Sequence, residues 1–65
     1  MMNQDAVTLI FSSRAEAARA AGLLDLKDIV DSAPFHRRIT VKLEGVLGAF
    51  ASLREDGFTD LKVEL

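Results

Sequence analysis

Three segments of the chain alternate apolar and polar residues with the period of two that marks a half-buried β-strand. They are residues 6–11, 35–43 and 59–65. The alternation predicts that one side of each strand faces a core and the other faces water. The side chains expected to face the core are Val7, Leu9, Phe11, Phe35, Ile39, Val41, Leu43, Leu61, Val63 and Leu65. A fourth, less regular strand is predicted at residues 26–30.

The segment after the first strand has the signals of a helix over residues 14–21. Ser13 and Glu16 have the spacing of a capping box, in which each side chain bonds the other residue's backbone N–H. Five alanines favour the helix and allow it to pack closely on a sheet. We expect Gly22 to end it as a left-handed cap, with Leu23 packing back on the last turn.

A second helix is predicted over residues 45–56, because Val46, Phe50 and Leu53 recur at i, i+4 and i+7. Gly57 should end it in the left-handed conformation, and Phe58 should pack back on the helix.

The predicted order is therefore βαββαβ, the split arrangement of the α+β ferredoxin-like fold. Residues 22–27 read Gly-Leu-Leu-Asp-Leu-Lys and residues 57–62 read Gly-Phe-Thr-Asp-Leu-Lys. This echo fits either a duplication or two similar solutions to one helix-to-strand connection. Right-handed crossovers put both helices on one face of a four-stranded antiparallel sheet with strand order 4-1-3-2.

The other sheet face should remain open to solvent. The side chains expected there are Thr8, Ile10, His36, Arg38, Thr40, Lys42, Asp60, Lys62 and Glu64. Ile10 is the single large apolar residue in this set, and an apolar residue ringed by polar groups is a reasonable contact site.

Composition limits the chain to one domain, residues 1–65, in which residues 1–5 are expected to be a flexible N-terminus. With 65 residues, 49% of them hydrophobic, and no Cys, the chain must build an apolar core or share one with a partner. The missing cysteines exclude disulfides, thiolate metal sites and a thiol nucleophile.

Net charge and hydropathy limit the kinds of partner and the cellular location that the chain is expected to have. The net charge of −2 argues against general nucleic-acid binding, which is usually basic. Apolar runs such as residues 9–11 are far shorter than the roughly 18 residues of a membrane span. Residues 1–5 lack the basic and apolar regions of a secretory signal, so we expect a cytoplasmic protein.

Catalytic and metal-binding patterns are weak. His36 is the only histidine, and no nucleophile motif or partner accompanies it. Asp25, Asp28 and Asp31 lie three apart but form no Ca²⁺-loop pattern. The glycines match neither phosphate-binding motif. We therefore expect no enzyme activity, no cofactor and no metal.

Three functional hypotheses remain. The first is a non-enzymatic protein-interaction module, acting as a small regulator, inhibitor, adaptor or accessory subunit through the open sheet face or a β-edge. Its expected contact residues are Ile10, His36, Arg38, Thr40, Lys42 and Lys62. The second is a dimerising sensor of a small ligand, because the predicted βαββαβ order resembles that of the ACT family. The third is weak binding of single-stranded nucleic acid on the Arg38/Lys42 strand, although no aromatic residue accompanies these cations for base stacking.

Overall fold

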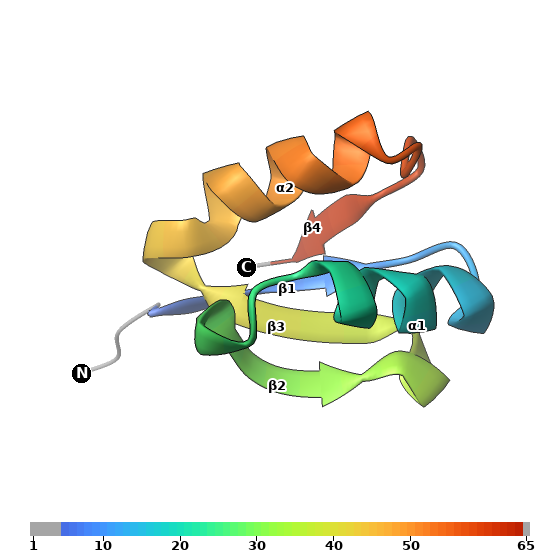
Figure 1. Ribbon diagram of the computed structural model, residues 1–65. Coiled ribbons are helices and arrows are strands. Elements are labelled where there is room, and N and C mark those ends of the chain that lie inside the picture. The colour runs from blue at the N-terminus through green and yellow to red at the C-terminus, as the bar shows by residue number, and fades with distance from the viewer. Residues whose placement is uncertain (1–4, 65) are drawn as a thin grey trace.

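The computed structural model describes residues 5–64 as an α+β fold with one antiparallel sheet (Figure 1). Within these residues the strands are β1 (Ala6–Ile10), β2 (Ile29–Ala33), β3 (Arg38–Lys42) and β4 (Lys62–Glu64). Their order across the sheet is β2-β3-β1-β4, which is the predicted order read from the opposite edge. The helices are α1 (Arg14–Leu23) and α2 (Val46–Glu55). The predicted α+β class, strand order and antiparallel sheet are therefore confirmed.

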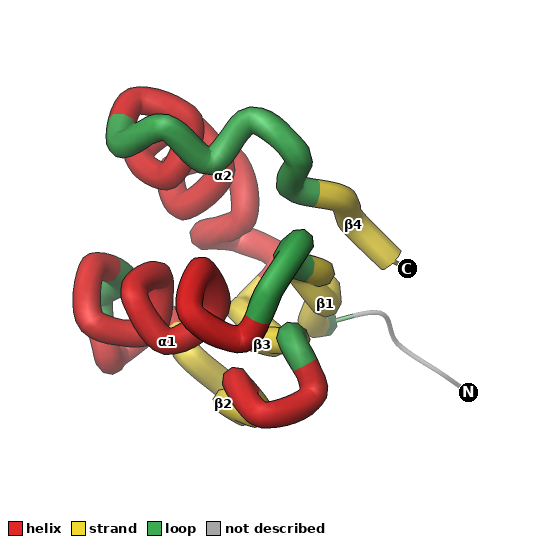
Figure 2. The backbone as a smooth tube through the Cα atoms, turned by 90° about the vertical axis from the view of Figure 1, so that its right-hand side faces the viewer, coloured by secondary structure: helices red, strands yellow, loops and turns green. Residues whose placement is uncertain are grey.

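One face of the sheet carries the core. In the register of β1 with β3, Leu9 lies opposite Ile39 and Val7 opposite Val41, and all four side chains are buried. The buried side chains that the rest of the chain adds to this cluster are Phe11, Ala17, Ala20, Leu24, Ala49, Leu53 and Phe58. Both helices therefore pack on the same face, as Figure 2 shows with α1 and α2 on one side of the strands.

The first helix begins where the sequence predicts and ends later. The Ser13 Oγ accepts a hydrogen bond from the Glu16 backbone N–H at 3.1 Å, so this half of the predicted capping box is confirmed. Among the described residues, no return bond from the Ser13 N–H to the Glu16 side chain is formed. The prediction for Gly22 is wrong: Gly22 is helical, and the helix runs on to Leu23. The Leu24 N–H bonds the Ala20 carbonyl at 3.0 Å in the normal helical pattern, so no left-handed residue is required.

The second helix ends as predicted. Gly57 has a φ of +96°, a conformation that favours glycine. The Gly57 N–H bonds the Arg54 carbonyl at 3.1 Å, and the Phe58 N–H bonds the Leu53 carbonyl at 3.0 Å. These two bonds define a Schellman motif.

Phe58 joins three parts of the fold. Its ring lies edge-on to the ring of Phe11 from the end of β1, with centroids 5.9 Å apart. The Arg19 guanidinium of α1 lies 4.2 Å from the Phe58 ring centroid and also donates to the Asp56 carbonyl at 3.3 Å. The end of α2 is thus attached to both β1 and α1.

The predicted strand at residues 35–43 is too long at its start. Pro34–His36 form a short 3₁₀ turn, and Arg37 is left-handed with a φ of 62°. Proline sets φ near −65°, which suits the turn, so its alternating neighbours do not extend the strand. Phe35 is 66% exposed instead of in the core, and the Arg14 guanidinium lies 4.1 Å from its ring centroid.

The other strand limits also shift. Residues 26–28 form a 3₁₀ turn, so β2 begins three residues later than predicted. Leu43 starts another 3₁₀ turn and is 47% exposed, so it does not join the core. Thr59 and Asp60 lie in a turn before β4.

At the chain ends, the Asp5 carbonyl accepts from the Leu43 N–H at 2.8 Å and extends the pairing of β1 with β3. The expectations for residues 1–4 and for Leu65 lie outside the described residues.

Replacing Leu53 by Ala should destabilise the protein by about 2–5 kcal/mol, because this fully buried side chain would leave a cavity. The matched control on the same helix is Leu47→Ala, which should change stability by less than about 0.5 kcal/mol because Leu47 is 81% exposed. Urea unfolding measures both. Equal effects of the two substitutions would contradict the core described here.

Gly57→Ala should lower stability by about 1 kcal/mol or more, because alanine is strained at a φ of +96°. Gly22→Ala is the control, since Gly22 is helical and a Cβ there meets nothing within 4 Å. It should stabilise by up to about 1 kcal/mol. Thermal melts compare the two variants, and a loss of stability in Gly22→Ala would show that the helix does end at Gly22.

Candidate functional site

The face of the sheet opposite the helices carries most of the predicted contact residues. Directly paired residues of antiparallel strands point to the same face, so the register defines rows across the sheet. The open face consists of Ala6, Thr8, Ile10, Asp31, Ala33, Arg38, Thr40, Lys42, Lys62 and Glu64. Five of the six predicted site residues belong to it: Ile10, Arg38, Thr40, Lys42 and Lys62.

The first row is basic around an apolar centre. Ile10 of β1 lies opposite Arg38 of β3 on one side and opposite Lys62 of β4 on the other. Ile10 is half-buried, whereas both cationic side chains are exposed. The row therefore offers an apolar contact between two positive charges.

The second row is polar and acidic. Thr8 and Thr40 lie opposite each other, and their hydroxyl oxygens are hydrogen-bonded at 3.0 Å. Asp31 lies beyond Thr40, and Glu64 lies beyond Thr8.

An ion pair links the two rows, since the Arg38 guanidinium reaches across β1 to the Glu64 carboxylate. Both side chains remain about half exposed, so the pair contributes little to stability but fixes the direction of the Arg38 side chain.

The third row contains a contact that the sequence prediction missed. Lys42 lies opposite Ala6, and together with Val30 they line a shallow hollow of about 560 Å³. Val30 is 56% exposed because the pairing of β2 with β3 is irregular between Ile29 and Asp31. The irregularity could not be read from the alternation, which places Val30 in an ordinary strand.

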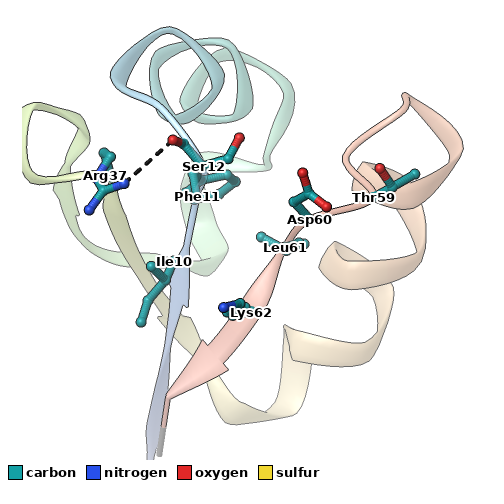
Figure 3. Close-up of a pocket in the computed structure, with 8 residues that line it drawn as sticks. All are labelled: Ile10, Phe11, Ser12, Arg37, Thr59, Asp60, Leu61 and Lys62. Carbon is teal, nitrogen blue, oxygen red and sulfur yellow. Dashed lines mark hydrogen bonds between the residues drawn. The ribbon is translucent and has the colours of Figure 1, made fainter.

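A second hollow of about 560 Å³ lies at the end of β1 (Figure 3). Its lining residues are Ile10, Phe11, Ser12, Arg37, Thr59, Asp60, Leu61 and Lys62. Arg37 lies on one side of the strand end and donates to the Ser12 carbonyl at 3.4 Å, while Asp60 lies on the other side. Two cationic side chains and one carboxylate thus border a partly apolar hollow.

His36 is the predicted site residue that does not belong to the open face. It lies in the 3₁₀ turn before β3, and its ring is edge-on to that of Phe35 with centroids 5.8 Å apart. Asp60, also expected on this face, lies in the turn before β4 and borders the hollow of Figure 3.

An apolar groove on the helix side was also missed. It has a volume of about 290 Å³ and is lined by Val7, Leu43, Val46, Leu47, Phe50 and Val63. Most of these residues were assigned to a closed core, but Leu43, Leu47 and Val63 are exposed. In the sequence only Leu47 could have indicated this groove, because it is a large apolar residue outside the i, i+4, i+7 stripe of α2.

Within residues 5–64, no three His, Asp or Glu side chains gather in a way that could hold a metal ion. Over the same residues, neither helix has the length and apolar character needed to cross a membrane.

Comparisons with known proteins give no family. No protein-family model, curated protein or solved structure matches the chain significantly.

Proposed function

We propose that this protein is a non-enzymatic protein-interaction module that binds a partner protein through its open face. The observation that carries the proposal is the first row, where Ile10 lies between Arg38 and Lys62 on the sheet face opposite the helices. The role would be that of a small regulator, inhibitor, adaptor or accessory subunit in the cytoplasm.

The arrangement supports a particular partner chemistry. An apolar side chain of the partner would pack on Ile10, with carboxylates placed toward Arg38 and Lys62. Lys42 in the third row adds a further cation beyond the acidic second row. Charge patterns of this kind give specificity and faster association more than raw affinity.

The βαββαβ order, the antiparallel sheet and the two helices on one face support assigning the chain to the ferredoxin-like fold. In this arrangement the chain completes its core on one face, so an open-face partner would add a surface contact. Folds of this kind serve many functions, so the proposed role rests on the residues of the open face and not on the fold.

The double variant Arg38→Glu and Lys42→Glu should lose a partner that the wild-type chain retains in affinity purification from a lysate of the source organism. Two positive charges facing the partner become negative, so retention should fall by at least about tenfold. Mass spectrometry with isotope labelling measures the ratio.

Arg54→Glu is the matched control, because Arg54 is an exposed cation in the last turn of α2, away from the open face. It should leave retention unchanged. Circular dichroism checks that each variant is folded. Equal retention by the double variant and the wild type would contradict the open face as the binding site.

A second candidate function is the binding of a small zwitterionic ligand in the hollow of Figure 3, as an ACT-like sensor. The supporting observation is that Arg37, Lys62 and Asp60 border a hollow whose volume falls in the range of small-molecule sites.

A ligand present at about 100 times its Kd should raise the melting temperature by roughly 10–20 °C, since it stabilises a small domain by about 2.7 kcal/mol. Screening the amino acids by thermal shift tests this. The variant Arg37→Asn removes one of the two cationic side chains, and Asn tolerates the left-handed backbone at this position. It should abolish the rise in melting temperature. A panel without any shift would remove this candidate.

A further inference from the structure

We propose that two copies of this chain associate through the free edges of their β4 strands, antiparallel and around a two-fold axis at Val63. The two sheets would then form one continuous sheet. This interface shares Lys62 with the open face of the proposed function, but its partner is a second copy of this chain, and its test has a different readout.

The hydrogen bonds define which backbone groups point outward. The Phe11 N–H bonds the Arg37 carbonyl at 2.9 Å, and the Leu43 N–H bonds the Asp5 carbonyl at 2.8 Å. The odd-numbered residues of β1 therefore bond toward β3, and its even-numbered residues bond toward β4.

It follows that Lys62 and Glu64, opposite Ile10 and Thr8, bond toward β1. The N–H and C=O of Val63 then point away from β1, at an edge with which no other strand of residues 5–64 pairs. A second β4 in antiparallel orientation can exchange two hydrogen bonds with Val63 as a hydrogen-bonded pair.

The charges of β4 are self-complementary in this register. With Val63 opposite Val63 of the second copy, each Lys62 lies opposite a Glu64. These are non-hydrogen-bonded pairs, in which the side chains lie closest together. Opposite charges placed directly across from each other stabilise strand pairing, and like charges oppose it.

The intramolecular ion pair extends this pattern. Glu64 already binds Arg38, and the second copy would place a Lys62 on its other side. Within residues 5–64 no ion pair joins Lys62 to a carboxylate, so Lys62 is available for this contact.

The apolar surface on the helix side of β4 also favours a second copy of this chain as the strand that pairs at this edge. Val63 is 44% exposed and lines the apolar groove together with Val46, Leu47 and Phe50 of α2. A strand added at the β4 edge would bring a second Val63 beside the first one. Part of the exposed apolar surface would thereby be removed from water.

The opposite edge of the sheet lacks these properties. The irregular pairing of β2 between Ile29 and Asp31 disrupts its ladder, and its following residues Asp31 and Ser32 are exposed and polar. An interrupted ladder of this kind discourages edge pairing, whereas the pairing of β4 with β1 is regular. The proposal therefore concerns β4 alone.

Sedimentation of the full chain over a wide concentration range tests the proposal. A three-residue edge makes a small interface, so we expect a reversible monomer–dimer equilibrium. Lys62→Glu and Glu64→Lys should each raise the dimer Kd by at least about tenfold, because each replaces two opposite-charge contacts by two like-charge contacts. An equimolar mixture of the two variants should dimerise again, since the mixed pair restores both complementary contacts.

Two further variants make the test specific. Val63→Pro removes the outward N–H without touching the bonds to β1, and it should abolish the dimer while circular dichroism stays native. Asp31→Lys on β2 is the matched charge control and should leave the dimer Kd unchanged. A wild-type chain that stays monomeric at the highest concentration would overturn the proposal. So would a dimer that Lys62→Glu does not weaken, or variants that fail to pair when mixed.

Discussion

The register between β1 and β3 is the constraint on which the rest of the structure depends. It places Leu9 against Ile39 and Val7 against Val41 beneath the two helices. A slip of one residue would turn the threonine of the shifted strand, Thr8 or Thr40, toward the core, where its hydroxyl would need a buried partner. In the observed register these hydroxyls bond each other on the open face. Among the described residues no buried side chain is polar, so the core is purely apolar.

A core on one face leaves the other face and one edge available. A chain of 65 residues buries only about 60% of its unfolded surface, so its stability is marginal. Here the burial is concentrated between the sheet and the helices, and small residues such as Ala17 and Ala20 allow α1 to pack closely. The open face and the β4 edge are therefore free to bind without disturbing the core.

Sequence patterns identified the elements that depend on local chemistry. The Ser13 cap, the glycine at the end of α2 and the alternation of β1 each follow from short-range rules, and all three are observed. Alternation along β1, β3 and β4 also placed five of the six predicted site residues on the open face. Face assignment needs only the strand period and the register.

The errors arise where one pattern is compatible with two structures. Phe35 alternates with Ile39 as a strand residue would, but Pro34 starts a turn and directs Phe35 to the surface. His36 leaves the open face for the same reason. Glycine permits a left-handed cap without requiring one, so Gly22 and Gly57 behave differently although their surrounding sequences match. The exposure of Val30 depends on the irregular pairing of β2, and the apolar groove depends on the placement of α2. No local sequence pattern specifies either one.

In this structure a single chain completes the core without a partner. Native-state hydrogen exchange of the Leu9 and Ile39 amides, in the Lys62→Glu chain so that edge pairing does not contribute, tests it most directly. These amides belong to the central strand pair and should exchange only through global unfolding, with an opening free energy that does not change on dilution. Protection that falls as the protein is diluted would contradict the account, because it would show that a second chain is needed to complete the core.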